Sequence, residues 1–264
     1  MAQHVTAPAI RARKGGTPVV MVTAYDAPTA RIADEAGVDV ILVGDSVAMV
    51  VLGYEDTLQV TVDDMAHHVG AVARARPRAL VVADLPWLSY HLSTEDAVRN
   101  AAALVRAGAS AIKLEGGRSR VAAVQAMVDA QIPVMGHLGL TPQSVHALGG
   151  YRVQGRGTGA EQLLADARAV QEAGAFAVVL EMVPADVAAQ VTKELAIPTI
   201  GIGAGVECDA QVLVSPDMTG LTGGRVPRFV KRYADLRGEL LRAAREYADD
   251  VRNGTFPGPE HSFE

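Results

Sequence analysis

Short apolar runs alternate along the chain with longer stretches in which apolar residues recur at helical spacing. One pattern occurs three times, in residues 35–45, 106–115 and 172–181: a helical stretch ends at a glycine, an apolar run follows, and the run closes on an acid. Glycine accommodates the left-handed conformation that ends many helices, and continuous apolar runs are typical of buried parallel strands. The pattern therefore predicts α/β units with an acid at the carboxyl end of each strand.

Five further apolar runs fit the same scheme and bring the candidate strands to eight, at 18–23, 79–83, 132–136, 198–202 and 211–214. The segments between them begin with helix-capping residues, such as Asp26 before Ala27-Pro28 and Thr61 three residues before Asp64. Eight strands alternating with helices match the size of a (β/α)8 TIM barrel, which is about 250 residues. We expect this single-domain α/β barrel, although strand counting alone leaves a doubly wound open sheet as the alternative.

No linker rich in serine or proline divides the chain, so we expect one domain over residues 1–264. Residues 1–16 form an N-terminal extension, and residues 227–251 have the amphipathic pattern of a C-terminal helix. The glycine-rich segment 138–159 interrupts the alternation of strands and helices and contains only a short helical pattern at 141–148. Loops of this length are functional lids or disordered segments.

Composition narrows the class of protein. Apolar residues make up 49% and charged residues 20%, and the formal net charge is −6, which disfavours binding to nucleic acid. The single cysteine, Cys208, rules out an intrachain disulfide and a cysteine-based zinc site. No apolar run approaches the roughly 18 residues of a membrane span, and residues 1–16 lack the apolar core of a signal peptide. We therefore expect a cytoplasmic enzyme without a membrane partner.

Three acids end predicted strands or follow them directly: Asp45, Asp84 and Glu115. In a TIM barrel the carboxyl ends of the strands form the active-site mouth, so these acids meet there. Carboxylates gathered in one place repel unless a cation neutralises them, and oxygen ligands suit Mg²⁺. The interpretation that each acid only caps the following helix stays open at this point.

The same mouth receives a lysine, a histidine and a fourth acid. Lys113 lies two residues before Glu115 and therefore on the same face of its strand, either as an ion pair or as a group that binds an anionic substrate. His137 ends the fifth predicted strand, just before the glycine-rich segment, and either a structural or a catalytic role is open for it. Glu181 ends an apolar run, where a desolvated carboxylate suits a general base and a salt bridge is the alternative.

The chain resembles the ketopantoate hydroxymethyltransferase family in an ordered series of motifs from about residue 17 to 233. They are TAYD at 23–26, GDS at 44–46, MVVLGY at 49–54, DLPW at 84–87, KLEGG at 113–117, GHLGLTPQ at 136–143, GGYRVQG at 149–155, EMVP at 181–184 and IGIGAG at 200–205. Two departures, Gln59 for an expected proline and Ala210 for an expected glycine, lie outside the motif positions that carry chemistry.

The resemblance implies a (β/α)8 barrel that depends on Mg²⁺ and forms a homo-oligomer, commonly a decamer. It implies transfer of a hydroxymethyl group from 5,10-methylenetetrahydrofolate to 3-methyl-2-oxobutanoate, giving 2-dehydropantoate and tetrahydrofolate through a metal-stabilised enolate. This is a step of pantothenate, and so coenzyme A, biosynthesis. The positions that match the family's functional residues are Asp45, Asp84 and Glu115 for the metal, Asp45, Ser46, Asp84, Lys113 and His137 for the substrate, and Glu181 for the catalytic proton acceptor.

Two other classes of function remain as alternatives. One is a Mg²⁺-dependent oxoacid lyase or mutase of the phosphoenolpyruvate/isocitrate lyase type. Isocitrate lyases use a cysteine within a Lys-Lys-Cys-Gly-His signature, which this chain lacks. The other is a barrel that binds an oxoacid without catalysis, which would not be expected to retain the metal-type acids, Lys113 and Glu181. The sequence leaves the physiological metal open among Mg²⁺, Mn²⁺ and Co²⁺.

Overall fold

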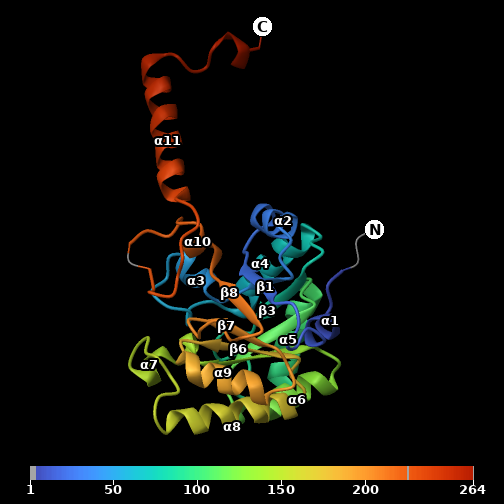
Figure 1. The fold of residues 1–264 in the computed structure, drawn as a ribbon. Coiled ribbons are helices and arrows are strands. Elements are labelled where there is room, and N and C mark those ends of the chain that lie inside the picture. The colour runs from blue at the N-terminus through green and yellow to red at the C-terminus, as the bar shows by residue number, and fades with distance from the viewer. Residues whose placement is uncertain (1–3, 225, 264) are drawn as a thin grey trace. The chain divides into compact units, whose positions relative to one another are not determined.

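A computed structural model of the chain describes residues 4–224 and 226–263. The described chain contains a closed barrel of parallel strands in the order β1 to β8 (Figure 1). The strands are β1 (Val19–Thr23), β2 (Val40–Val43), β3 (Leu80–Asp84), β4 (Ala111–Glu115), β5 (Val134–Gly139), β6 (Ala177–Glu181), β7 (Thr199–Ile202) and β8 (Ala210–Leu213). All eight predicted strands are confirmed. The doubly wound alternative is wrong, because β1 pairs with β8 and closes the sheet.

Contacts within the chain group into two units, Met1–Val214 and Ser215–Glu264. The barrel and its helices belong to the first unit, where the helices lie outside the strands (Figure 1). The helices of the first unit are α1 (Ala7–Arg11), α2 (Ala27–Glu35), α3 (Val47–Val50), α4 (Val62–Arg74), α5 (Thr94–Ala107), α6 (Val121–Asp129), α7 (Val145–Leu148), α8 (Gly159–Glu172) and α9 (Ala185–Glu194), with 3-10 turns η1 (Arg118–Arg120) and η2 (Pro142–Ser144).

The predicted helix starts follow from capping chemistry. Asp26 accepts a hydrogen bond from the backbone N–H of Thr29, and Thr61 and Asp64 form a reciprocal capping box at the start of α4. The buried face of α5 consists of small and branched residues, Ala97, Ala101 and Leu104. Helices of this kind pack closely against a sheet that has few aromatic residues.

The barrel departs from a strict alternation of strands and helices at one connection and from the predicted strand ends at β5. The connection from β7 to β8 is a turn over residues 203–209 without a helix. β5 continues past the predicted end at residue 136 to Gly139, so His137 is part of the strand. The strand extends to Gly139 because the backbone groups of this run pair with β4 and β6.

The N-terminal extension contributes to the first unit at the amino ends of β1 and β8. The Lys14 ammonium lies 2.9 Å from Oδ2 of Asp209, and the backbone N–H of Gly15 donates to Oδ1 of the same carboxylate at 2.9 Å. Asp209 also accepts a hydrogen bond from the backbone N–H of Thr199 at 2.8 Å. One carboxylate therefore joins the extension to the strands that close the barrel.

The second unit contains α10 (Ser215–Met218), α11 (Leu236–Asn253) and the 3-10 turn η3 (Pro259–His261). The C-terminal helix was predicted over 227–251 but begins at Leu236, because Asp235 accepts a hydrogen bond from the N–H of Gly238 and so caps the helix there. The segment before it contains Pro227 and is not helical. The assignment of residues 1–264 to one domain stays a prediction. Within the described residues, no helix has both the length and the apolar character to cross a membrane.

Candidate active site

The strand register brings the predicted site residues together at the carboxyl ends of neighbouring strands. Asp84 at the end of β3 pairs with Lys113 in β4, and Glu115 at the end of β4 pairs with His137 in β5. These four side chains and Asp45, just after β2, are each 5% exposed or less. Lys113 and Glu115 lie two residues apart in β4, and both side chains are buried.

Asp84 and Lys113 form a buried ion pair with Asp45 beside them. Nζ of Lys113 lies 3.0 Å from Oδ1 of Asp84, and Oδ2 of Asp84 accepts a hydrogen bond from the backbone N–H of Asp45 at 3.1 Å. Burial lowers the pKa of Lys113, but the surrounding acids outweigh it and raise the pKa overall, so the ammonium keeps its charge. Burial and the neighbouring charge of Asp84 raise the pKa of Asp45 well above its usual value.

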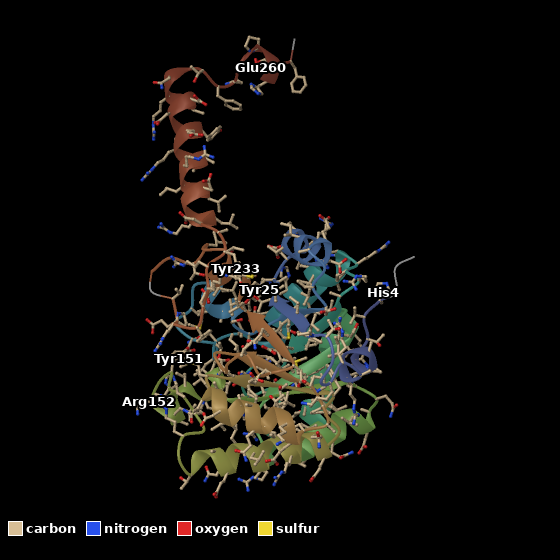
Figure 2. All side chains as sticks on the ribbon, viewed as in Figure 1. His4, Tyr25, Tyr151, Arg152, Tyr233 and Glu260 are labelled. Carbon is tan, nitrogen blue, oxygen red and sulfur yellow. The ribbon has the colours of Figure 1, made fainter. Side chains whose placement is uncertain are left out.

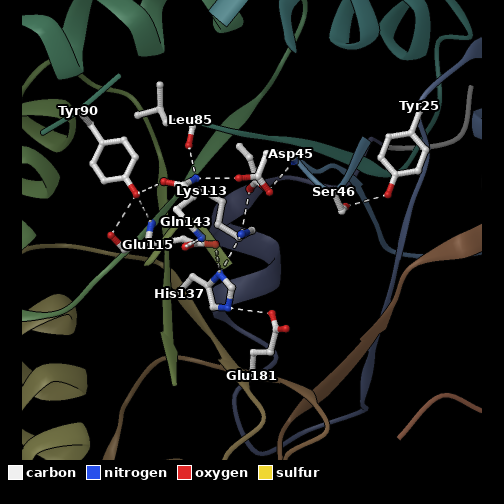
Figure 3. Close-up of polar contacts among 11 residues, drawn as sticks. Tyr25, Asp45, Ser46, Leu85, Tyr90, Lys113, Glu115, His137, Gln143 and Glu181 are labelled. Carbon is white, nitrogen blue, oxygen red and sulfur yellow. Dashed lines mark hydrogen bonds and ion pairs between the residues drawn. The ribbon is translucent and has the colours of Figure 1, made fainter. Parts of the chain in front are cut away.

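His137 links the other two acids. Its Nδ1 lies 3.2 Å from Oε1 of Glu115, and its Nε2 lies 3.2 Å from Oε2 of Glu181 (Figure 3). Burial and the nearby Lys113 ammonium, 3.2 Å from Nδ1, oppose protonation, but the contacts with the two carboxylates raise the pKa of His137 to about 9. At neutral pH both ring nitrogens therefore carry protons that face the two acids.

Two further buried residues belong to this cluster and were missed as site residues from the sequence. The side chain of Gln143, in η2, donates hydrogen bonds from Nε2 to Oδ2 of Asp45 at 2.8 Å and to the backbone carbonyl of Leu85 at 2.9 Å. The hydroxyl of Tyr90, in the loop after β3, lies 2.6 Å from Oε1 of Gln143. These pairs are separated by up to 98 residues in the chain, so no local pattern signals them.

Ser46 lies at the start of α3, next to Asp45. Its hydroxyl is 2.9 Å from the hydroxyl of Tyr25, which follows β1. Burial raises the pKa of Tyr25, so its hydroxyl stays protonated and able to donate. The backbone carbonyl of Tyr25 lies 2.7 Å from Nδ1 of His68 in α4. Ser46 is only partly buried, so it borders the mouth of the barrel.

The backbone around Glu181 adopts conformations that hold the end of β6 close to β5. Gly139 has φ +89°, and a Cβ at this position would lie 2.3 Å from the carbonyl oxygen of Glu181, which only glycine avoids. Met182, directly after Glu181, has the uncommon φ of +47° for a residue with a side chain. Its N–H donates to the carbonyl of Ile202 at 2.9 Å, which stabilises this conformation.

The structure decides between the alternative interpretations of the acids. None of Asp45, Asp84 and Glu115 is the capping residue of a helix: the residue before α3 is Ser46, no helix directly follows Asp84, and the residue before η1 is Gly117. The interpretation that these acids serve as helix caps is therefore wrong. A direct Lys113–Glu115 ion pair is not formed either, because Lys113 pairs with Asp84 and Glu115 contacts His137.

The arrangement of the acids is not that of a complete metal-binding site. Among the described residues, no group of three or more His, Cys, Asp or Glu side chains is arranged to hold a metal ion. The cluster nevertheless gathers four carboxyl groups, those of Asp45, Asp84, Glu115 and Glu181, around the two cationic side chains of Lys113 and His137. Oδ1 of Asp84 is buried and, apart from its ion pair with Lys113, has no partner of good hydrogen-bond geometry among the described residues. Both observations fit a site that receives a cation through Asp45 and Asp84.

The glycine-rich segment 138–159 is ordered into short elements. The predicted helical signal at 141–148 is confirmed as η2 followed by α7. Tyr151 and Arg152 follow α7 (Figure 2), and the Tyr151 hydroxyl lies 3.7 Å from Sδ of Met49 in α3. Burial and the charges of Asp56 and Glu181 raise the pKa of Tyr151. The segment therefore lies near the carboxylates of the site.

Comparison with known proteins gives strong matches over nearly the whole chain. The sequence model of ketopantoate hydroxymethyltransferase matches residues 4–259. A 3-methyl-2-oxobutanoate hydroxymethyltransferase of Saccharopolyspora erythraea is 63% identical over 245 residues, which cover 92% of this chain and 84% of that protein. A protein of the same name from Moorella thermoacetica is 57% identical, with 100% of both chains covered.

Solved structures with the same fold are more distant in sequence. A 2,3-dimethylmalate lyase of the phosphoenolpyruvate mutase/isocitrate lyase superfamily has a TM-score of 0.61 at 21% identity and covers 100% of this chain and 93% of that chain. A phosphoenolpyruvate phosphomutase from Streptomyces platensis has a TM-score of 0.63 at 17% identity, with 94% and 88% covered. These structures share the barrel fold, whereas the sequence matches are specific. The chain belongs to the ketopantoate hydroxymethyltransferase family.

Proposed function

We propose that this chain transfers a hydroxymethyl group from 5,10-methylenetetrahydrofolate to 3-methyl-2-oxobutanoate, giving 2-dehydropantoate and tetrahydrofolate. The observation that carries the proposal is the buried arrangement in which Lys113 faces Asp84 and His137 faces Glu181 at one barrel mouth. It occurs in a chain that is 63% identical to a protein named for this activity. The substrates and the donor are small molecules, in keeping with a cluster of functional side chains that is mostly buried.

Asp45 and Asp84 are the residues that would hold a divalent metal, for which we propose Mg²⁺. Mg²⁺ is commonly held by one or two carboxylates together with substrate and water, so a third protein ligand is not needed. Glu115, the third predicted ligand, lies nearby with its oxygens on His137 and on the backbone N–H of Gln143. When bound, the cation supplies Lewis-acid polarisation of the oxoacid's keto group and so acidifies the hydrogen on C3.

Lys113 and Ser46 would hold the oxoacid. The Lys113 ammonium is buried and charged, and it therefore offsets the negative charge of the substrate carboxylate and of the enolate that forms from it. Ser46 lies at the mouth with its hydroxyl oriented by Tyr25, which leaves the serine able to hydrogen-bond an oxygen of the substrate. His137 contributes a second positive charge close to the same position.

Glu181 would remove the proton from C3 of the oxoacid. Its side chain is 16% exposed, against 4% for His137, so it is the acid of this pair that is open to the mouth. The C3–H bond breaks, the proton passes to the Glu181 carboxylate, and the electron pair forms the enolate. C3 forms a bond to the methylene carbon of the donor, and both carbon–nitrogen bonds of that methylene group break in the overall reaction. Water supplies the hydroxyl group of 2-dehydropantoate, and its second proton and the proton taken from C3 go to the two nitrogens of tetrahydrofolate.

We also propose a cytoplasmic homo-oligomer, a decamer by the family resemblance. Support comes from α11, whose large apolar residues Leu240, Tyr247 and Val251 recur at helical spacing and so form one apolar face. An apolar helix face of this kind is typical of an interaction surface. Light scattering coupled to size-exclusion chromatography tests the assembly: a monomer at micromolar concentration would contradict it.

The activity is tested by incubating purified protein with 3-methyl-2-oxobutanoate, Mg²⁺ and 5,10-methylenetetrahydrofolate and following the product by NMR. The proposal expects 2-dehydropantoate that depends on both the donor and the metal. Parallel incubations with 2,3-dimethylmalate and with phosphonopyruvate test the lyase and mutase alternatives. Cleavage or rearrangement of one of these, without hydroxymethyl transfer, would contradict the proposed function.

A further inference from the structure

Gln143 forms hydrogen bonds with two acids of the site, although it lies in a different element of the fold from both of them. It lies in η2, after β5, whereas Asp45 follows β2 and Glu115 ends β4. Its side chain donates to Oδ2 of Asp45 at 2.8 Å, and its backbone N–H donates to Oε2 of Glu115 at 3.0 Å (Figure 3). The residue therefore bridges two carboxylates that come from different strands.

The amide of Gln143 has all its hydrogen-bonding groups engaged. Its two N–H bonds are used by Asp45 and by the backbone carbonyl of Leu85, at 2.8 and 2.9 Å. Its carbonyl oxygen is 2.6 Å from the Tyr90 hydroxyl. Gln143 is buried, so an amide rotated by 180° would leave its oxygen facing the carboxylate of Asp45, which is repulsive.

Tyr90 determines which end of the amide faces Asp45. The Tyr90 oxygen accepts a hydrogen bond from the backbone N–H of Glu115 at 3.2 Å. Its single proton has two acceptors within reach, the Glu115 carbonyl at 3.2 Å and Oε1 of Gln143 at 2.6 Å. The shorter contact places the proton on Gln143, and the amide N–H groups then point to Asp45.

We infer that Gln143, held by Tyr90, is a positioning residue that orients the Asp45 and Glu115 carboxylates for the cation and the oxoacid. This inference deepens the proposed function and rests on it for the identity of the oxoacid. An amide donor fixes the direction of a carboxylate without adding a charge, unlike a lysine or an arginine. The geometry of Asp45 is therefore held by a neutral partner, which adds no positive charge that would compete with a cation.

The inference also gives a role to the first part of segment 138–159. η2 starts directly after Thr141, and its backbone places Gln143 against the ends of β2, β3 and β4 through Asp45, Leu85 and Glu115. A change in the conformation of this segment would therefore alter the positions of Asp45 and Glu115, through the side chain and the backbone N–H of Gln143.

The test compares Gln143→Met, Gln143→Glu and Tyr90→Phe with the wild-type chain. Binding of Mn²⁺ alone is followed by electron paramagnetic resonance, and kcat and KM for 3-methyl-2-oxobutanoate are measured in parallel. Gln143→Met removes the donors at similar size, and Gln143→Glu replaces them with a carboxylate. Gln125→Met is the matched control, because Gln125 makes the same Gln–Asp hydrogen bond, to Asp129 at 2.9 Å, on the exposed face of α6.

Gln143→Met is expected to bind Mn²⁺ about tenfold or more weakly, as for a lost hydrogen bond to a charged group, with kcat falling more than KM rises. Gln143→Glu adds a carboxylate that attracts the cation, so it should lose kcat without this loss of Mn²⁺ affinity. Tyr90→Phe keeps the ring and the Gln143 side chain and should give a smaller loss in the same direction as Gln143→Met. Gln125→Met should match the wild type. Unchanged Mn²⁺ affinity and kcat in Tyr90→Phe and in a folded Gln143 variant would overturn the inference.

If a Gln143 variant does not fold, as judged by circular dichroism, the outcome is decided by Tyr90→Phe, which removes a single hydroxyl. The two proposals fail separately. A wild-type chain that binds Mn²⁺ but forms no 2-dehydropantoate contradicts the proposed function, and the Mn²⁺ comparison among the variants still tests the role of Gln143.

Discussion

Nε2 of His137 lies 3.2 Å from Oε2 of Glu181, so a buried imidazole in β5 faces the acid that ends β6. The pKa of His137 is raised to about 9, and the ring therefore presents an N–H to Glu181 at neutral pH. A positively charged ring beside a carboxyl group attracts it and restricts its direction. This pair supplies what a general base at the barrel mouth needs: an acid with a neighbour that holds its position.

Replacing His137 with phenylalanine should therefore impair proton removal more than substrate binding. His137→Phe keeps a ring of similar size but removes both N–H groups, leaving Glu181 without its partner. We expect deuterium exchange at C3 of 3-methyl-2-oxobutanoate to fall about 100-fold, the scale of a misplaced catalytic group. The exchange is followed by NMR, and oxoacid binding by calorimetry. His67→Phe, at an exposed position of α4, is the control; an equal exchange rate in the two variants would rule out this role for His137.

Asp84→Asn should raise the metal requirement. The substitution keeps the shape of the side chain but removes one of the two carboxylates that are proposed to hold the cation. The same carboxylate is the ion-pair partner of Lys113, so this pair is lost as well. We expect the Mg²⁺ concentration for half-maximal exchange to increase at least about tenfold, as for the loss of one charged ligand. The measurement is a Mg²⁺ titration of the exchange rate, with the exposed Asp129→Asn as the control. An unaltered titration curve would remove Asp84 from the proposed ligands.

The stability contributed by Asp209 should depend on pH. Burial raises the pKa of this carboxyl, but hydrogen bonds from Lys14, Thr199 and Gly15 outweigh it and lower the pKa below its usual value. A lowered pKa in the folded state stabilises the protein above the unfolded-state value, about 4, and this contribution is lost as the pH falls through the folded-state pKa.

Asp209→Asn should accordingly lower the melting temperature at pH 7, by an amount that shrinks below pH 4. The side chain is 6% exposed, so the loss corresponds to about 2 kcal/mol, as for a charged hydrogen-bond acceptor in a protected position. Melting curves of the wild type and the variant at pH 7, 5 and 3 provide the test. A difference that is the same at pH 3 as at pH 7 would show that the charge of Asp209 is not what stabilises the barrel closure.

The strands were predictable because their signal is local. A glycine that ends a helix, an apolar run and a closing acid lie within about ten residues, as in the runs that end at Glu115 and Glu181. The same local signal placed Asp45, Asp84, Lys113 and His137 at one mouth, because all parallel strands of a barrel end on the same side. The register of β3, β4 and β5 places Asp84, Lys113 and His137 at this end of neighbouring strands, and Asp45 follows the end of β2.

The partners of these residues could not be predicted, because they come from distant segments. The Gln143–Asp45 and Tyr90–Gln143 contacts join residues 98 and 53 positions apart. The start of α11 was missed for a different reason: the helical periodicity continues before Asp235, but the capping contact of that residue sets the boundary. Periodicity reports which face of a helix is apolar and does not fix where the helix begins.

The role of Glu181 as the base is tested most directly by solvent deuterium exchange at C3 of 3-methyl-2-oxobutanoate. The exchange is measured by NMR for the wild type and for Glu181→Gln, with and without Mg²⁺ and without the folate. Gln keeps the size of the side chain and removes the proton acceptor. The account predicts metal-dependent exchange in the wild type and a loss of at least about 100-fold in Glu181→Gln, with the oxoacid still bound. Equal exchange in the two proteins would contradict it.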